Sequence, residues 1–122
     1  MKNLVLDIDK TLTLGDNKDY NLVSPNLKLI DKVREYKEKG FNIILFTARN
    51  MRTHNNNIGK ITAQTLPIIF KWLEKNNVPF DEIYVGKPWC GDDGFYVDDK
   101  AIRPSEFISK SYSQIKNILD DE

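Results

Sequence analysis

Residues 43–46 read Ile43-Ile44-Leu45-Phe46, an uninterrupted apolar run that follows a helix stop signal at Gly40. A second short apolar run, Leu4 to Ile8, lies near the start of the sequence. Short runs that are apolar throughout are typical of strands buried on both faces of a parallel sheet. The two runs therefore predict two strands of one parallel sheet, with a helix between them.

That connecting helix is expected to start at Ser24-Pro25, because serine is a good N-cap and proline suits the first turn. Its end is expected just before Gly40, at the position where glycine commonly terminates a helix. Apolar residues recur at helical spacing between these two signals. They are Leu27, Ile30, Val33 and Tyr36.

The rest of the chain continues the alternation of helices and strands. A second helix is predicted from about Ile61 to Asn76, and Pro67 requires that it either starts near Thr65 or kinks there. Further short strands are predicted at 81–85 and 95–97, and a C-terminal helix is marked by Tyr112, Ile115, Ile118 and Leu119. Strands separated by helices favour an α/β fold with a mainly parallel sheet.

Composition excludes several classes of protein. The chain has 122 residues, with 18 Lys and Arg against 18 Asp and Glu, one Cys and one His. This length predicts a single domain, 1–122. One imidazole and one thiol make a histidine-based zinc site, a Ser-His-Asp triad and a Cys-His dyad improbable. Zero net charge argues against nucleic acid as a partner. We find no membrane span and no export signal, and expect a cytoplasmic protein.

Polar residues follow each predicted strand. Asp7-Ile8-Asp9-Lys10-Thr11 follows the first, Thr47-Ala48-Arg49 the second, Gly86-Lys87-Pro88 the third and Asp98-Asp99 the fourth. Ligands bind beyond the carboxyl ends of the strands in open parallel sheets. The four carboxylates of this set would repel one another unless some protonate or a cation binds. Oxygen ligands without His or Cys suit Mg²⁺ best.

These residue types suit phosphoryl transfer. A carboxylate can attack phosphorus and form an aspartyl phosphate, which divides one difficult hydrolysis into two easier steps. Both the nucleophile and the phosphate are anions, so a cation and a Lys ammonium would be needed to offset their repulsion. A second carboxylate would protonate the leaving oxygen and later deprotonate the attacking water.

The four strand-end segments, taken in order, resemble the motifs of the haloacid dehalogenase-like phosphohydrolases. The resemblance covers residues 4–99, and many members have Gly where this chain has Lys10. It implies a Rossmann-like three-layer α/β/α fold with a central, mainly parallel sheet. It implies Asp7 as nucleophile, Asp9 as general acid/base, and Thr47 and Lys87 as phosphoryl-binding residues. It also implies a Mg²⁺ site formed by the Asp7 carboxylate, the Asp9 carbonyl and the Asp98 carboxylate, with Asp99 supporting these ligands without binding the metal directly.

The segments around Thr47, Lys87 and Asp98 are similar to a small bacterial subgroup that has no cap domain and is often labelled capsule-biosynthesis phosphatase. Residues 12–23 suffice only for a short flap, and residues 48–86 for a loop, one helix and a strand. A capless site is open, so we expect a homo-oligomer, a dimer or a tetramer. Residues 49–60 are the expected local cover.

Candidate substrate contacts surround the expected catalytic residues. Thr11, in the segment after the first strand, is one of them. Arg49 would either bind a substrate anion or be a solvated loop residue, and Asn50 is similar. Trp89 would line the pocket or pack under the loop. The complete set is Thr11, Ala48, Arg49, Asn50 and Trp89.

The expected function is that of a Mg²⁺-dependent phosphomonoesterase acting on a small soluble phosphate ester, such as a sugar, polyol or amino-alcohol phosphate of capsular or surface-polysaccharide biosynthesis. One alternative is a receiver-like phosphoacceptor domain, although a receiver has its acidic pair after the first strand and its acceptor Asp in mid-chain. Another is a 3′-phosphatase of nucleic-acid ends, which zero net charge disfavours. A last alternative, an inactive structural relative, is disfavoured by the intact motifs.

Overall fold

The computed structural model describes residues 2–121. The chain divides into two compact units, Met1–Trp89 and Cys90–Glu122, and each is described here by itself. Our expectation of one domain over residues 1–122 stays a prediction. Among the described residues, no helix combines the length and the apolar character that crossing a membrane requires.

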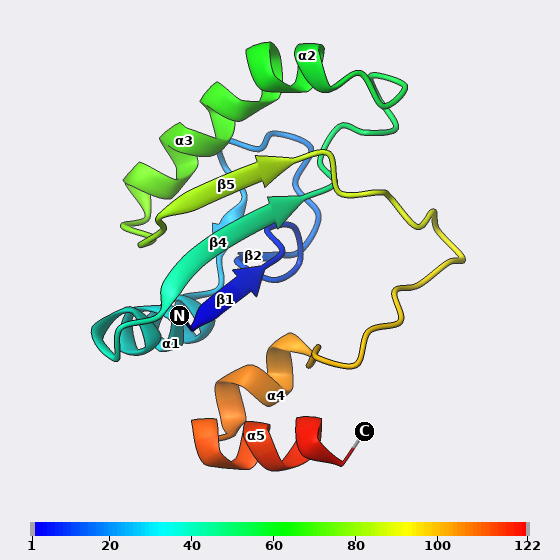
Figure 1. The fold of residues 1–122 in the computed structure, drawn as a ribbon. Helices are drawn as coiled ribbons and strands as arrows, with labels where there is room; N and C mark the ends of the chain where they lie inside the picture. Colours follow the sequence, from blue (N-terminus) through cyan, green and yellow to red (C-terminus); the bar gives the residue numbers. More distant parts are fainter. Residues whose placement is uncertain (1, 122) are drawn as a thin grey trace. The chain divides into compact units, whose positions relative to one another are not determined.

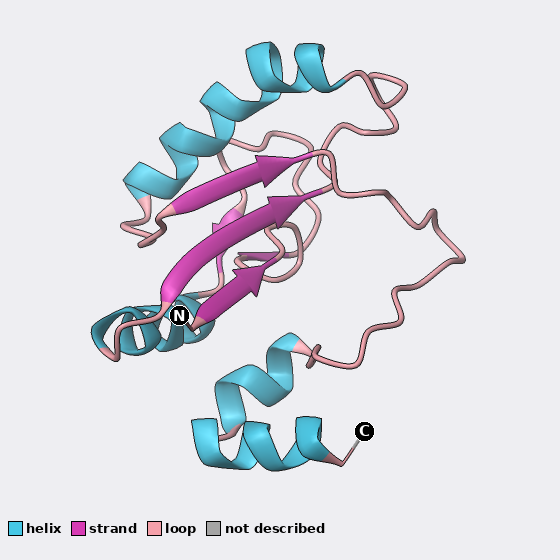
Figure 2. Ribbon diagram, viewed as in Figure 1, coloured by secondary structure: helices cyan, strands magenta, loops and turns pink. Residues whose placement is uncertain are grey.

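A parallel sheet forms the centre of the first unit (Figures 1 and 2). Its strands are β1 (Asn3–Leu6), β4 (Asn42–Thr47) and β5 (Glu82–Val85), in the order β1-β4-β5. Both pairs are parallel, with Leu6 opposite Leu45 and Leu45 opposite Ile83. The predicted α/β class and the predicted parallel pairing are therefore confirmed.

Two helices, α1 (Leu27–Glu38) and α3 (Leu66–Lys75), connect these strands. The strands follow one another in a single direction across the sheet, and right-handed crossovers then place both helices on the same face. The core between sheet and helices is closely packed. Its fully buried side chains include Ile30, Val33, Ile43, Leu45, Ile69 and Leu73.

The opposite face of the sheet differs from the prediction that its strands are buried on both sides. Val5, Ile44, Phe46 and Tyr84 line a hollow of about 280 Å³ there. The side chains of Val5 and Tyr84 are 56% and 53% exposed. Continuous apolar runs are typical of strands buried on both faces, but within the first unit by itself this face of the sheet is exposed.

The start of α1 also differs from the prediction. Ser24–Pro25 forms β3, which pairs antiparallel with β2 (Thr13–Leu14), so these residues are extended rather than helical. Asn26 is the N-cap, and its Oδ1 accepts a hydrogen bond from the Leu29 N–H at 3.3 Å. The Asn26 amide also donates to the Thr11 carbonyl at 3.2 Å, which ties the helix start to the loop after β1. The predicted stop at Gly40 is confirmed by its φ of 92°.

The second helical segment begins earlier than predicted. It starts with α2 (Ile58–Lys60), capped by the Asn57 side chain, and continues through the π-helical turn η1 (Ile61–Thr65) into α3. Proline lacks an N–H and crowds the carbonyl four residues before it. The wider turn at 61–65 ends two residues before Pro67, so the helix accommodates this proline by widening before it.

The second unit lacks the predicted strand at 95–97, since these described residues have no regular structure. Phe95 and Val97 are 77% and 90% exposed. A run of three residues next to Gly94 is too short to specify a strand unless it pairs with a neighbour. The unit contains α4 (Pro104–Ser109), which we did not predict, and α5 (Tyr112–Asp120), which confirms the expected C-terminal helix.

Candidate active site

The carboxyl ends of β1, β4 and β5 lie at one edge of the sheet because the three strands are parallel (Figure 1). Asp7 and Asp9 follow β1, Thr47 ends β4, and Lys87 follows β5. The Lys87 N–H donates to the Thr47 carbonyl at 3.1 Å, which continues the strand pairing one step beyond β5. The structure thus brings the four predicted catalytic residues to the same edge.

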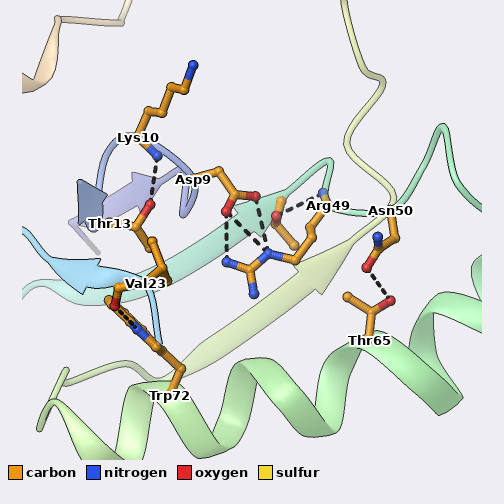
Figure 3. A network of polar contacts seen from close by, with 9 residues as sticks. Asp9, Lys10, Thr13, Val23, Arg49, Asn50, Thr65 and Trp72 are labelled. Atoms are coloured by element: carbon orange, nitrogen blue, oxygen red, sulfur yellow. Dashed lines mark hydrogen bonds and ion pairs between the residues drawn. The ribbon is translucent and has the colours of Figure 1, made fainter. Parts of the chain in front are cut away.

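A tight turn orients the two aspartates. The Ile8 carbonyl accepts hydrogen bonds from the N–H groups of Thr11, Leu12 and Thr13, at 3.2, 2.9 and 3.2 Å. Ile8 itself is fully buried, so its neighbours on either side point away from the core. Lys10 has a φ of 60°, and its N–H donates to Thr13 Oγ1 at 2.9 Å (Figure 3). The turn requires left-handed backbone at Lys10, the position where many members of the family that the sequence resembles have Gly.

Asp7 is half-buried, and its pKa is raised above the ordinary value. Burial is the largest cause, because it removes water from the charged form. The nearby Lys87 ammonium opposes this effect, as do the Ile8 N–H and the Arg49 guanidinium, whereas the Asp9 carboxylate adds to it. Asp7 therefore lies within electrostatic reach of Asp9, Arg49 and Lys87.

Arg49 forms a forked ion pair with Asp9 (Figure 3). Arg49 Nη2 donates to Asp9 Oδ1 at 2.8 Å, and Nε contacts Oδ1 and Oδ2 at 3.3 and 3.2 Å. The side chain of Arg49 is 1% exposed and that of Asp9 is 41% exposed. The guanidinium carbon also lies 4.2 Å from the ring centroid of Tyr20. Arg49, predicted as a substrate contact or a solvated loop residue, is thus buried against Asp9.

The backbone after β4 is held by further hydrogen bonds. Thr47, fully buried, accepts at Oγ1 from the Arg49 N–H at 3.0 Å. Asn50 has a φ of 62°, and its Oδ1 accepts from Thr65 Oγ1 at 2.8 Å (Figure 3). Ala48 is half-buried, and its carbonyl accepts from the Met51 N–H. This segment, expected to be a polar loop over 49–60, consists of consecutive turns up to residue 56 and then begins α2 at Ile58.

The remaining predicted substrate contacts have different environments. Thr11 is half-buried within the turn after β1. Trp89 is 43% exposed, and the Arg52 guanidinium lies 5.4 Å from its ring centroid. An exposed indole at the end of the first unit, covered by an arginine, can contact a ligand or stabilise the loop around it.

Asp98 and Asp99 belong to the second unit, where both are exposed. Asp98 Oδ1 accepts a hydrogen bond from the Lys100 N–H at 2.8 Å, a local turn. Among residues 2–121, the structure forms no group of three or more His, Cys, Asp or Glu side chains that could hold a metal ion. Asp7 and Asp9 belong to the first unit, so the predicted convergence of the four carboxylates stays a prediction.

Tyr20 is the residue of this site that sequence reasoning missed. It lies in the polar segment between β2 and β3, where nothing in the local pattern connects it with Arg49. The one available signal is that it is an aromatic residue in a stretch of otherwise mostly polar residues. Such a residue in a loop usually has a partner, because an aromatic ring gains most from contact with another side chain.

The fold and the site together define a small α/β protein with a carboxylate, lysine and threonine cluster at the carboxyl edge of a parallel sheet. No family model and no curated protein matches the chain. The crystal structure of a structural genomics target from Vibrio cholerae is similar to it, with 54% identity, a TM-score of 0.98, and coverage of 99% of this chain and 98% of that one. The chain belongs to the same family as that protein, whose description states no function.

Proposed function

We propose that this protein is a Mg²⁺-dependent phosphomonoesterase of the haloacid dehalogenase-like type, without a cap domain and with the three-layer fold of that family. The observation that carries the proposal is the environment of Asp7. Its carboxylate is half-buried at a strand end, with Lys87 as the strongest neighbouring positive charge and Asp9 two residues on. A desolvated carboxylate beside a cation can attack an anionic phosphate whose charge that cation offsets.

The chain's own residues supply the steps of such a reaction. A carboxylate oxygen of Asp7 bonds to phosphorus while the bond from phosphorus to the ester oxygen breaks. Asp9 gives a proton to that leaving oxygen and afterwards takes one from water. The water oxygen then bonds to phosphorus, which releases inorganic phosphate and restores the Asp7 carboxylate. Lys87 and the Thr47 hydroxyl hold the non-bridging oxygens in both steps.

The residues of the first unit fit a magnesium ion in part. Burial raises the pKa of Asp7, so a cation beside this carboxylate would relieve the cost of its charge. The Asp9 side chain is engaged by Arg49, most closely at Oδ1. The resemblance implies the Asp9 backbone carbonyl, rather than this side chain, as a ligand of the metal. Asp98 or Asp99 would complete the set. Mg²⁺ bound there would neutralise phosphate charge and polarise the phosphorus centre.

We further propose a small soluble substrate, a sugar, polyol or amino-alcohol phosphate of capsular or surface-polysaccharide biosynthesis, and a cytoplasmic homo-oligomer. The support is the equal number of acidic and basic residues and the resemblance to the capless subgroup. An exposed indole at Trp89 would suit a polyhydroxylated leaving group.

The test is phosphate release from a panel of sugar, polyol, amino-alcohol and nucleotide phosphates, with Mg²⁺ and with a chelator. We expect multiple turnovers on at least one small ester with Mg²⁺, and loss of this activity in Asp7→Asn. Asp31→Asn, which changes an exposed carboxylate on α1, is the matched control and should retain the rate. No release across the panel, with only stoichiometric labelling by acetyl phosphate, would instead support the receiver-like alternative.

A further inference from the structure

The forked pair between Arg49 and Asp9 carries an inference about how the second aspartate is positioned, and it rests on the proposed function. We infer that Arg49 is a positioning residue that fixes the Asp9 carboxylate for proton transfer, and that Tyr20 holds Arg49 in that orientation. Neither residue is expected to touch the reacting phosphate.

The two carboxylate oxygens of Asp9 differ in how closely Arg49 binds them. Oδ1 accepts the short bond from Nη2 at 2.8 Å together with a contact from Nε at 3.3 Å. Oδ2 has a single longer contact, from Nε at 3.2 Å. A carboxylate oxygen has more than one lone pair, so Oδ2 retains room for a proton or a substrate oxygen. Oδ1 is thus the anchored oxygen and Oδ2 the one that exchanges protons with substrate and water.

Burial makes the anchor rigid. The Arg49 side chain is 1% exposed, whereas the Asp9 side chain is 41% exposed, so the fork holds Asp9 from its buried side. The Arg49 N–H bond to Thr47 Oγ1 fixes the backbone from which the arginine extends. A planar guanidinium with two engaged nitrogens allows much less rotation of its partner than a single ammonium would.

Tyr20 completes the anchor from the flap. Its ring lies 4.2 Å from the guanidinium carbon, on a residue between β2 and β3. Arg49 Nη1 is buried and has no hydrogen-bond partner within the described part of the chain. A cation with an unused donor keeps its place more readily when an aromatic face is stacked against it. The flap therefore acts on Asp9 through Arg49.

The activity test compares two leaving groups. An alkyl phosphate needs a proton on its departing oxygen, whereas nitrophenolate leaves without one. We expect Arg49→Lys, which keeps the charge but loses the fork, to lower kcat/KM for the alkyl ester on the order of 100-fold. The same variant should change kcat/KM for p-nitrophenyl phosphate by only a few-fold, since this quantity reports the steps up to phosphoryl transfer to Asp7.

Two further variants separate positioning from folding. Tyr20→Leu should reproduce the selective loss of kcat/KM on the alkyl ester in weaker form. Tyr20→Phe, which keeps the ring, should retain the wild-type kcat/KM on that ester. Arg34→Lys is the matched control, because Arg34 lies on α1 and its guanidinium bonds the Asp31 carboxylate and the Asn77 carbonyl, away from the site. Equal losses on both esters in Arg49→Lys would overturn the inference.

A second readout does not depend on activity. The Nε–H of Arg49 should give a proton–nitrogen NMR signal that exchanges slowly with water and is shifted by the Tyr20 ring. Tyr20→Phe should keep this signal, and Tyr20→Leu should move it and speed its exchange. Absence of the signal in the wild-type protein overturns the inference whatever the enzyme does. A normal signal in a protein that hydrolyses no phosphate ester overturns the proposed function, and with it the positioning role.

Discussion

The backbone N–H of Lys87 donates to the carbonyl of Thr47 at 3.1 Å, so the last residue of β4 and the segment after β5 are held together at the edge of the sheet. The Lys87 side chain lies close enough to Asp7 for its positive charge to be the strongest of the effects that lower the pKa of that carboxyl group. The site is therefore built from strand ends, which have little freedom to move apart.

Replacement of Lys87 by Met should lower kcat on the order of 100- to 1,000-fold, the usual cost of removing one group that stabilises transition-state charge. The measurement is steady-state phosphate release with saturating Mg²⁺. Lys75→Met, an exposed lysine in the last turn of α3, is the matched control and should keep the wild-type rate. A Lys87→Met enzyme of wild-type activity would remove this lysine from the mechanism.

Replacement of Asp7 by Asn should raise the free energy of unfolding at neutral pH in buffer that contains a chelator. The folded-state pKa of Asp7 is raised, so the folded chain holds this proton more tightly than the unfolded one. Stability is then lost as pH rises from the unfolded pKa through the folded pKa, and Asn avoids this loss. Thermal unfolding at several pH values tests the sign: the gain should vanish below the ordinary carboxyl pKa.

Magnesium should reverse the order of stability of the wild-type protein and Asp7→Asn. A cation that binds only the folded state stabilises it by mass action, and Asp7 is one of its expected ligands. Added Mg²⁺ should therefore raise the melting temperature of the wild-type protein and have little effect on Asp7→Asn. Equal shifts in both proteins would place the metal elsewhere.

Asp81 gives the opposite pH dependence. Its carboxylate accepts from the Ile43 N–H at 2.8 Å and pairs with Lys37, and these two contacts, in that order, lower its pKa. Stability from Asp81 is thus fully present above its unfolded pKa and is lost as pH falls through its folded pKa. Asp81→Asn should destabilise the protein near pH 7 more than near about pH 3. A loss that is constant with pH would contradict this account.

Trp72 tests the attachment of α3 to the segment before α1. Its indole N–H donates to the Val23 carbonyl at 2.8 Å, and the side chain is 2% exposed (Figure 3). Trp72→Phe keeps most of the apolar contact but leaves this buried carbonyl without its donor, so a loss of about 1–3 kcal/mol is expected in urea unfolding. Phe70→Leu, at a residue that is 42% exposed, should cost less.

The sequence predicted the parts of the fold that depend on local pattern. The strand near Ile43 and the stop at Gly40 were predicted correctly because apolar runs and a left-handed glycine are local signals. The start of α1 was wrong, because Ser24-Pro25 carries a helix signal that pairing with Thr13–Leu14 overrides. The strand at 95–97 was wrong because its residue types favour a strand, but a run of three forms one only when it pairs with a neighbouring strand.

The same division applies to the site. The positions of Asp7, Asp9, Thr47 and Lys87 at the edge of the sheet could be predicted, because each lies at the carboxyl end of a strand or within three residues of it. The burial of Arg49 could not, since it depends on Tyr20 and Asp9, which approach it from other segments. Contacts of this kind depend on tertiary packing, and the periodicity of the sequence does not reveal them.

Trapping the covalent intermediate tests whether Asp7 becomes phosphorylated and whether water then hydrolyses this aspartyl phosphate. Asp9→Asn should slow the second step, so brief incubation with Mg²⁺ and p-nitrophenyl phosphate followed by acid quench should trap the phosphoryl group. We expect mass spectrometry to find it on the peptide that contains Asp7, labile to hydroxylamine, and absent from the double variant with Asp7→Asn. A phosphoryl group on another residue, or hydrolysis that continues in Asp7→Asn, would contradict the account.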